Sequence, residues 1–243
     1  MKFKTIVLIC FFVMGTSAFG QADTNESTAT ETGGPQAEYI GVDSAQQELA
    51  EISLSKFEDD GYWTAYMPTD EGLISLRRFE GTPLDKRKLE EEEKSGIVEE
   101  DRYVLGAKVN HIHRAATYFS VKPLRPIPIP GKTKILSLWI VGRNVRHSLY
   151  AIVNDHFGNR AKISMGELNF TGWKELRATI PPHIRQQDPR YNNKTGIQVT
   201  EFLIETDPAE TYGNYYFYMD DLRAVTDLFS ENNRDADDMA DYW

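Results

Sequence analysis

Short stretches in which hydrophobic and polar residues alternate or cluster fill the chain from residue 61 to residue 229. Gly, Pro, Asn and Asp separate them, and long helical periodicity is almost absent. Such stretches predict β-strands. We expect strands at 102–109, 115–124, 134–142, 148–155, 160–166, 174–182, 196–206 and 214–222. Turn residues at 142–144 and 154–159 fit hairpins. The pattern predicts a mainly β protein, an antiparallel β-sandwich or jelly roll with short helical insertions.

The two ends of the chain differ from this central domain. Residues 1–20 contain two lysines, an apolar run and small residues, which is typical of a secretory signal peptide. Residues 21–38 are polar and small, and we expect a disordered leader. The sandwich is expected over 39–229, where 45–54 fits either a short helix or an entry strand. Residues 230–243 form an acidic tail that ends in apolar side chains.

Two internal segments break the strand rhythm. Residues 85–101 are highly charged and fit either a solvated surface helix or a mobile insertion. Residues 123–132 carry alternate prolines, which predict an extended surface connection rather than a central strand.

Charge and cysteine content narrow the class of protein. The formal net charge is −10 and becomes −12 when Lys2 and Lys4 leave with the signal peptide. This acidity argues against a nucleic-acid partner. The single cysteine, Cys10, lies within the signal peptide, so the sandwich is held by its core rather than by disulfides. The apolar run of the signal is too short for a stable membrane span.

The segment "YYFYMDDL", residues 215–222, raises the question of an acidic site. Asp220 and Asp221 are adjacent, and neighbouring residues of a regular strand point to opposite faces. We therefore expect no catalytic carboxylate pair, and with no nucleophile elbow either we expect no enzyme and no required cofactor. If the first and last strands pair, Glu58 and Asp221 could share a structural Ca²⁺. The alternative is that both are strand ends whose carboxylates accept backbone N–H groups.

Aromatic residues could form a platform for sugars. The candidates are Tyr62, Trp63, Trp139, Trp173 and Tyr215–Tyr218. Alternation in a strand places half of such a run in the core, and we expect Trp139 to pack there.

Four sequence features in a fixed order resemble the spirochaete flagellar filament outer layer (sheath) proteins, the FlaA family. They are W-x-x-G at 139–142, N-D-x-x-G at 154–158, F-x-G-W-K at 170–174 and Y-x-D-D-L at 218–222. The fold-level pattern is also similar to galactose-binding and other carbohydrate-binding β-sandwich modules, in which an early F-E and a late D-D flank a calcium.

The FlaA resemblance implies a structural subunit of the periplasmic flagellum. It would coat a core of flagellin-like proteins together with other sheath subunits and contribute to filament stiffness, shape and motility. For partner contacts we predict Arg143, Arg146, His147 and Arg160, basic residues of an acidic protein. The alternative function is a secreted carbohydrate-binding module.

Overall fold

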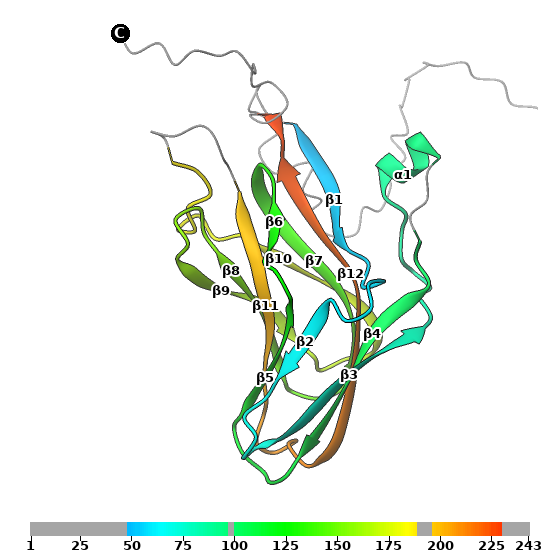
Figure 1. The fold of residues 1–243 in the computed structure, drawn as a ribbon, viewed down its shortest axis with the longest axis vertical. Helices are drawn as coiled ribbons and strands as arrows, with labels where there is room; N and C mark the ends of the chain where they lie inside the picture. The colour runs from blue at the N-terminus through cyan, green and yellow to red at the C-terminus, as the bar shows by residue number, and fades with distance from the viewer. Residues whose placement is uncertain (1–47, 97–99, 189–195, 230–243) are drawn as a thin grey trace, which may run out of the picture. The chain divides into compact units, whose positions relative to one another are not determined.

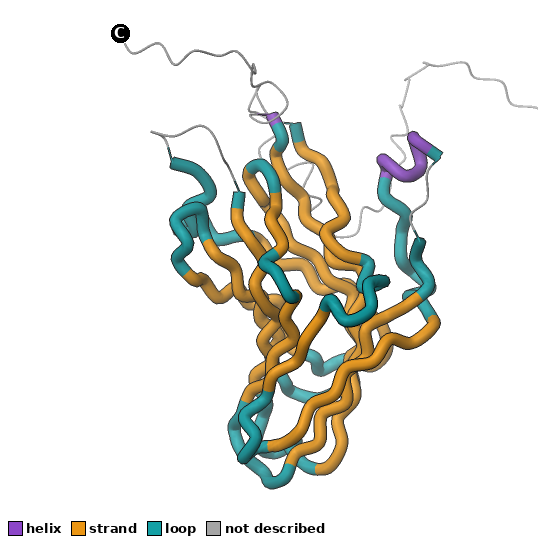
Figure 2. The backbone as a smooth tube through the Cα atoms, in the orientation of Figure 1, coloured by secondary structure: helices purple, strands orange, loops and turns teal. Residues whose placement is uncertain are grey.

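The computed structural model describes residues 48–96, 100–188 and 196–229. Two antiparallel sheets pack face to face, as predicted (Figure 1). Sheet A contains, in order, β10 (Thr171–Thr179), β7 (Lys132–Arg143), β12 (Gly213–Asp227), β4 (Tyr103–His111) and β3 (Gly72–Glu80), and β1 (Leu49–Ser55) also pairs with β12. Sheet B contains β2 (Trp63–Tyr66), β5 (Tyr118–Pro123), β11 (Ile197–Glu205), β8 (Ser148–Asn154) and β9 (Arg160–Glu167), and β6 (Ile127–Ile129) pairs with β11. Strands dominate the described chain (Figure 2), and α1 (Glu90–Ser95) is short.

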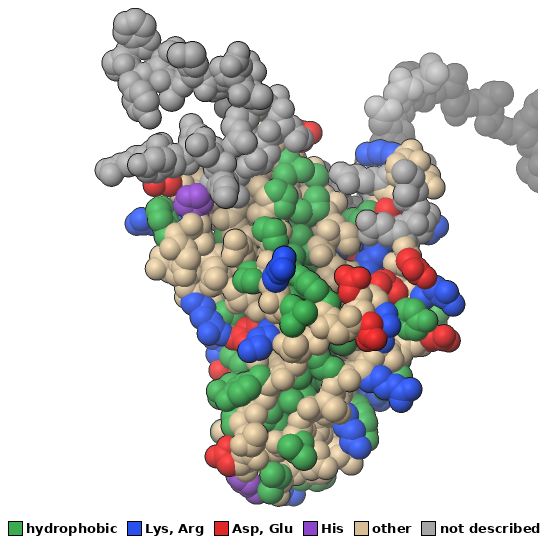
Figure 3. Space-filling view, viewed as in Figure 1, with side chains coloured by type: hydrophobic (Ala, Val, Ile, Leu, Met, Phe, Trp, Pro, Cys, Tyr) green, Lys and Arg blue, Asp and Glu red, His purple; other side chains and the backbone are tan. Residues whose placement is uncertain are grey.

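The core lies between the sheets because alternate residues of each strand point inward. Leu136, Leu138 and Ile140 of β7 belong to the same core cluster as Phe202 and Ile204 of β11, and all five are fully buried. On the side seen in Figure 3, hydrophobic side chains form a band with charged side chains on either side. This core needs no disulfide to close it.

The entry segment is a strand rather than a helix. β1 runs antiparallel to β12, with Ile52 opposite Ala224 and Ser55 opposite Leu222. The first and last strands therefore pair, which was the condition set for a shared site of Glu58 and Asp221. It brings the chain just before Glu58 close to the middle of β12.

The proline-rich segment is only partly the surface connection that we expected. β5 extends to Pro123, and Ile127 and Ile129 of β6 are buried and pair with β11. Pro128 is exposed between them. Among the described strands β6 pairs only with β11, so it lies at an edge, where a proline without an N–H group is tolerated. The predicted signal peptide, the predicted leader and the acidic tail lie outside the described residues.

Candidate functional site

The outer face of sheet A carries aromatic rings and cations side by side where β12 begins. Tyr218 lies opposite Gly106 of β4, which lies opposite Arg77 of β3. Two residues earlier in β12, Tyr216 lies opposite Lys108, and the Arg143 Nε donates to the Tyr216 carbonyl at 3.4 Å. We call this set the basic–aromatic face: Arg77, Phe79, Lys108, Arg143, Tyr216 and Tyr218.

Gly106 makes room for the aromatic pair at the centre of this face. The rings of Phe79 and Tyr218 meet edge to face over it, with centroids 5.5 Å apart and an interplanar angle of 79°. A Cβ atom at Gly106 would lie 2.5 Å from the Phe79 ring. The glycine in the middle of β4 is thus explained by the rings that cover it.

Each cation of the face lies against a ring rather than a carboxylate. The Arg77 guanidinium is 5.6 Å from the Phe79 centroid, and the Lys108 ammonium is 5.7 Å from the Tyr216 centroid. Arg143 lies 5.7 Å from the Tyr218 centroid. Within the described ranges, none of the three cations forms an ion pair. The face is therefore locally positive in a chain of net charge −10.

The rings of this face are accessible as well as structural. Phe79 is 40% and Tyr216 is 41% exposed. Aromatic residues and arginine are enriched at protein–protein interfaces and at their energetic anchors. A face built from these residue types can accept a partner that supplies carboxylates and apolar groups.

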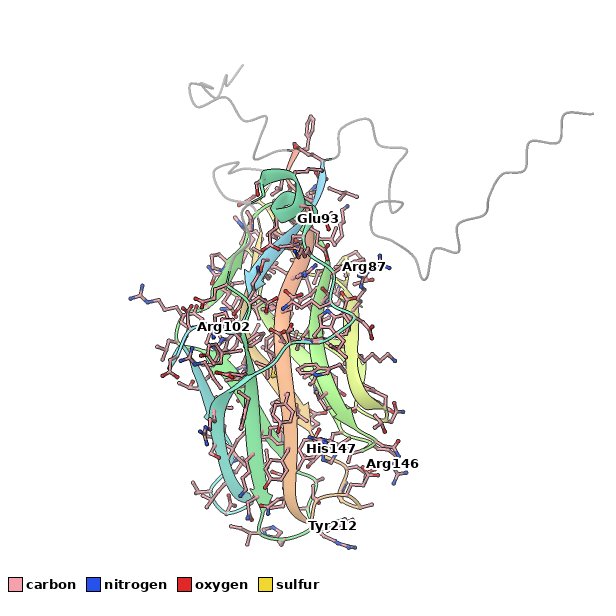
Figure 4. The ribbon with its side chains drawn as sticks, turned by 90° about the vertical axis from the view of Figure 1, so that its right-hand side faces the viewer. Arg87, Glu93, Arg102, Arg146, His147 and Tyr212 are labelled. Carbon is pink, nitrogen blue, oxygen red and sulfur yellow. The ribbon has the colours of Figure 1, made fainter. Side chains whose placement is uncertain are left out.

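The described parts of the β3–β4 segment, residues 81–96 and 100–102, cover the neighbouring part of sheet A. In Figure 4, which looks onto this sheet, the segment crosses in front of β12 on its way to Arg87 and α1. Lys86 is 6% exposed at its side chain, and its Nζ donates to Asp101 at 2.8 Å and to Asp220 at 3.0 Å. Leu89 is also buried. The alternative of a mobile insertion is therefore wrong for the part around Lys86, because a buried ion pair holds it to the sheet. The alternative of a surface helix is confirmed for α1, where Glu93 and Lys94 are exposed.

A β-bulge places both aspartates of "MDDL" on the same side. Asp220 pairs with Trp139 and Leu222 pairs with Leu138, so Asp221 is an extra residue in β12, with a φ of 51°. The Asp221 Oδ2 lies 2.7 Å from Nη2 of Arg223, an outward-facing residue. Our argument that the two carboxylates point to opposite faces holds for a regular strand and is wrong here.

Burial changes the proton affinity of the cluster formed by Lys86, Asp101, Asp220 and Asp221, which we call the Lys86 cluster. Removal from water raises the pKa of Asp220 to about 7, although Lys86 opposes the change. Burial also acts to lower the pKa of Lys86, but Asp220 and Asp101 outweigh it, and that pKa is raised. The Oδ1 atoms of Asp220 and Asp221 accept no hydrogen bond within the described structure. Loss of Lys86 would therefore leave buried carboxylates with little to stabilise their charge.

The two predicted calcium ligands have other contacts in the described structure. The Glu58 Oε1 accepts the N–H groups of Arg102 and Tyr103 at 2.6 and 2.8 Å, at the start of β4. Asp221 is fully buried beside Arg223. Over residues 48–96, 100–188 and 196–229, no group of three or more His, Cys, Asp or Glu side chains is arranged to hold a metal ion.

The four predicted contact residues do not form one patch. Arg143 belongs to the basic–aromatic face, whereas Arg146 pairs with Asp207 and Glu210 in the turn after β7. Arg160 begins β9, at the opposite end of β8 from this turn, and pairs with Glu201.

The fourth predicted contact residue, His147, lies in the interior of the protein. It is 0% exposed and packs its ring against Tyr215, 5.0 Å between centroids. Burial therefore removes it from the surface.

The aromatic residues named from the sequence divide between core and surface. Trp63, Tyr215 and Phe217 are buried. Trp139 is only half-buried, because it shares the outer face of β7 with Ser137 while Leu138 and Ile140 point inward. The expectation of core packing for Trp139 is wrong. Sequence reasoning also missed Arg77 and Phe79, although the alternation in "GLISLRRFE" could have placed them on one strand face.

A second aromatic row lies on the outer face of sheet B. Tyr66 of β2 pairs with Ser120, which pairs with Leu203, which pairs with Tyr150 of β8. Tyr118 lies beside Tyr66, with ring centroids 6.3 Å apart. Tyr66 is 48% and Tyr118 is 42% exposed. These residues were absent from the predicted platform.

Comparison with known proteins decides the family. The profile described as "Flagellar filament outer layer protein Flaa" matches residues 21–234. The chain belongs to this family. A relative, the "Putative flagellar filament outer layer-like protein" of Brachyspira hyodysenteriae, is 36% identical over 222 residues, which cover 91% of this chain and 97% of the relative. The flagellar filament outer layer protein of Spirochaeta aurantia is 30% identical over 119 residues, 45% of this chain and 35% of that protein. The resemblance found in the sequence is thereby confirmed.

Solved structures related to this FlaA-family chain are distant. The family 11 carbohydrate-binding module of a Clostridium thermocellum cellulase has a TM-score of 0.41 and 12% identity, covering 74% of this chain and 96% of that one. The TmCBM61 module in complex with a galactotriose has a TM-score of 0.38 and 11% identity, covering 69% of this chain and 89% of that module. In the described part of the chain, no helix has the length and apolarity required to cross a membrane.

Proposed function

We propose that this protein is an outer-layer subunit that coats the flagellin core of a periplasmic flagellar filament. Membership of the flagellar filament outer layer family, with a relative aligned over 97% of its length, carries the proposal. In this proposal the chain is exported by its N-terminal segment and acts in the periplasm. Its role is structural rather than catalytic.

Assembly requires contacts that repeat along the filament. A subunit layer grows when one surface of each copy meets a different surface of the next, because such heterologous contacts do not close. The basic–aromatic face supports this role, since it combines exposed rings with cations that no described carboxylate neutralises. The coat would stiffen the filament by adding packed β-sandwiches around the core.

The direct test uses filaments from the native host. Periplasmic filaments are isolated from the wild type and from a strain that lacks this gene, and their composition and diameter are measured by mass spectrometry and electron microscopy. We expect this protein on wild-type filaments and thinner filaments in the deletion strain. Recovery of the protein only in the soluble periplasmic fraction, with filament diameter unchanged, would refute the proposal.

The tyrosines of sheet B favour carbohydrate binding as a second candidate function. Tyr66 and Tyr118 present exposed rings on one sheet face, and Lys122 lies 5.9 Å from the Tyr66 centroid. Flat rings flanked by polar groups are suited to stack on sugar rings. Affinity electrophoresis in soluble β-glucans and galactans tests this. Carbohydrate binding would be supported if a glycan retards the wild type and the exposed control Tyr212→Ala but does not retard Tyr66→Ala or Tyr118→Ala. If no glycan retards the wild type, these ligands are excluded.

The structural Ca²⁺ predicted for Glu58 and Asp221 remains a separate proposal. Pairing of Ser55 with Leu222 supports it by bringing the two acidic segments near each other. If the site binds Ca²⁺ with a Kd near 10 µM, then 1 mM Ca²⁺ adds about 2.7 kcal/mol of stability. The unfolding midpoint in urea is measured with Ca²⁺ and with a chelator. An identical midpoint in both would dismiss the calcium site.

A further inference from the structure

We propose that the basic–aromatic face binds the acidic C-terminal tail, residues 230–243, of a second copy of this chain. The inference rests on the proposed function, because it supplies the repeating contact that an outer layer requires.

Charge complementarity selects this partner. The tail "SENNRDADDMADYW" contains five acidic residues and one arginine, and it ends in Tyr and Trp. The face offers Arg77, Lys108 and Arg143 without competing ion pairs among the described residues, and exposed rings beside them. Carboxylates of the tail would meet the cations, and its apolar side chains would pack on Phe79 and Tyr216.

The direction of β12 favours a contact between copies. β12 runs from Gly213 to Asp227, and the face surrounds Tyr216 and Tyr218 near its beginning, whereas the tail follows its far end. At about 3.3 Å per residue, the ten steps along the strand from Phe217 to Asp227 span roughly 33 Å. Copies arranged head to tail would place the tail of one beside the face of the next. This arrangement is heterologous and extends without closing.

The tail is long enough to make the contact. Its 14 residues reach at most about 46 to 50 Å when fully extended. That length spans the face of a neighbouring copy, and it would also let the tail fold back onto its own face. The experiment must therefore separate contacts between chains from contacts within one chain.

The first measurement is self-association of the full mature chain by sedimentation velocity from about 1 to 200 µM. We expect oligomers whose population rises with protein concentration. Their association constant should fall at least tenfold when NaCl rises from about 0.05 to 0.5 M, because the contact is electrostatic. A face variant with Arg77→Glu, Lys108→Glu and Arg143→Glu should remain monomeric. The matched control reverses the charge of three exposed residues outside the strands of sheet A, with Lys88→Glu, Arg125→Glu and Arg185→Glu, and should associate like the wild type.

A charge exchange then identifies the partner. A tail variant with Asp235→Lys, Asp237→Lys, Asp238→Lys and Asp241→Lys should be monomeric alone but should form mixed oligomers with the face variant. Monomers in the mixture, or a wild type that stays monomeric at every concentration, would overturn the inference. Circular dichroism checks that each variant is folded.

The same proteins distinguish this inference from the proposed function. Wild-type and face-variant chains are mixed with isolated core filaments, and the bound fraction is measured by pelleting. Binding to the core without self-association would refute the tail contact and leave the coating proposal intact. Self-association without binding to the core filaments would refute the coating proposal and leave the tail contact intact.

Discussion

The Nζ atom of Lys86 lies 3.0 Å from Oδ2 of Asp220, and 134 residues separate the two in sequence. The lysine comes from the β3–β4 segment and the aspartate from the bulged part of β12. Both side chains are removed from water, so each depends on the other for its charge. The contact joins a charged excursion, which resembles a surface loop in the sequence, to the centre of a sheet.

Removal of the lysine should be costly. We expect Lys86→Met to lower the free energy of unfolding by about 3 kcal/mol, because it leaves Asp220 buried without a cation. Urea denaturation at pH 8 measures the loss. The matched control is Lys88→Met, which removes an exposed lysine of the same segment and should cost less than about 0.5 kcal/mol.

The stability lost by Lys86→Met should be smaller at low pH than at high pH. Burial raises the pKa of Asp220 to about 7, so the aspartate takes up a proton in the folded state as pH falls below 7. A neutral Asp220 no longer requires a cation. We therefore expect Lys86→Met to cost less at pH 5.5 than at pH 8. The double variant with Asp220→Asn should lose this pH dependence, and an equal cost at both pH values would contradict our description of the pair.

His147 should make the protein sensitive to acid. Burial lowers its pKa to about 4, whereas the nearby Glu210 acts in the opposite direction and His111 in the same one. Its neutral form therefore contributes stability above the unfolded pKa of about 6.5, and this stability is lost as pH falls toward 4, by about 3 kcal/mol at most. His147→Asn keeps a polar side chain that cannot titrate in this range.

The test for His147 compares how steeply the free energy of unfolding changes with pH in the wild type and in His147→Asn. We measure the free energy of unfolding for wild type and His147→Asn at several pH values between 4 and 7.5. The difference between the two proteins cancels the contribution of Asp220, and wild type should lose more stability on acidification. Parallel curves would show that His147 does not take up a proton on unfolding in this range.

The sequence predicted the sandwich because alternation reports which strand face is buried, and this local signal is present in β11. It failed for Trp139 because both faces of β7 carry apolar residues, so the pattern does not say which face lies inward. It failed for Asp221 because a bulge adds one residue and reverses the facing of a side chain. The Lys86–Asp220 contact was not predictable, since nothing local links a loop lysine to a distant strand.

The glycine that joins β6 to β7 should be more sensitive to substitution than a glycine in an open turn. Gly131 and Gly61 have similar positive φ values of 70° and 74°, so alanine should cost about 1 kcal/mol at either position for conformation alone. A Cβ atom at Gly131 would lie 2.3 Å from the Asp227 carbonyl oxygen, whereas a Cβ atom at Gly61 would meet nothing within 4 Å. Because the obstacle at Gly131 is backbone of β12, relief requires the strands to move. We expect Gly131→Ala to lower the free energy of unfolding by about 3 kcal/mol and Gly61→Ala by about 1 kcal/mol in urea denaturation. Equal losses would mean that the β6–β7 turn can move away from β12 without cost.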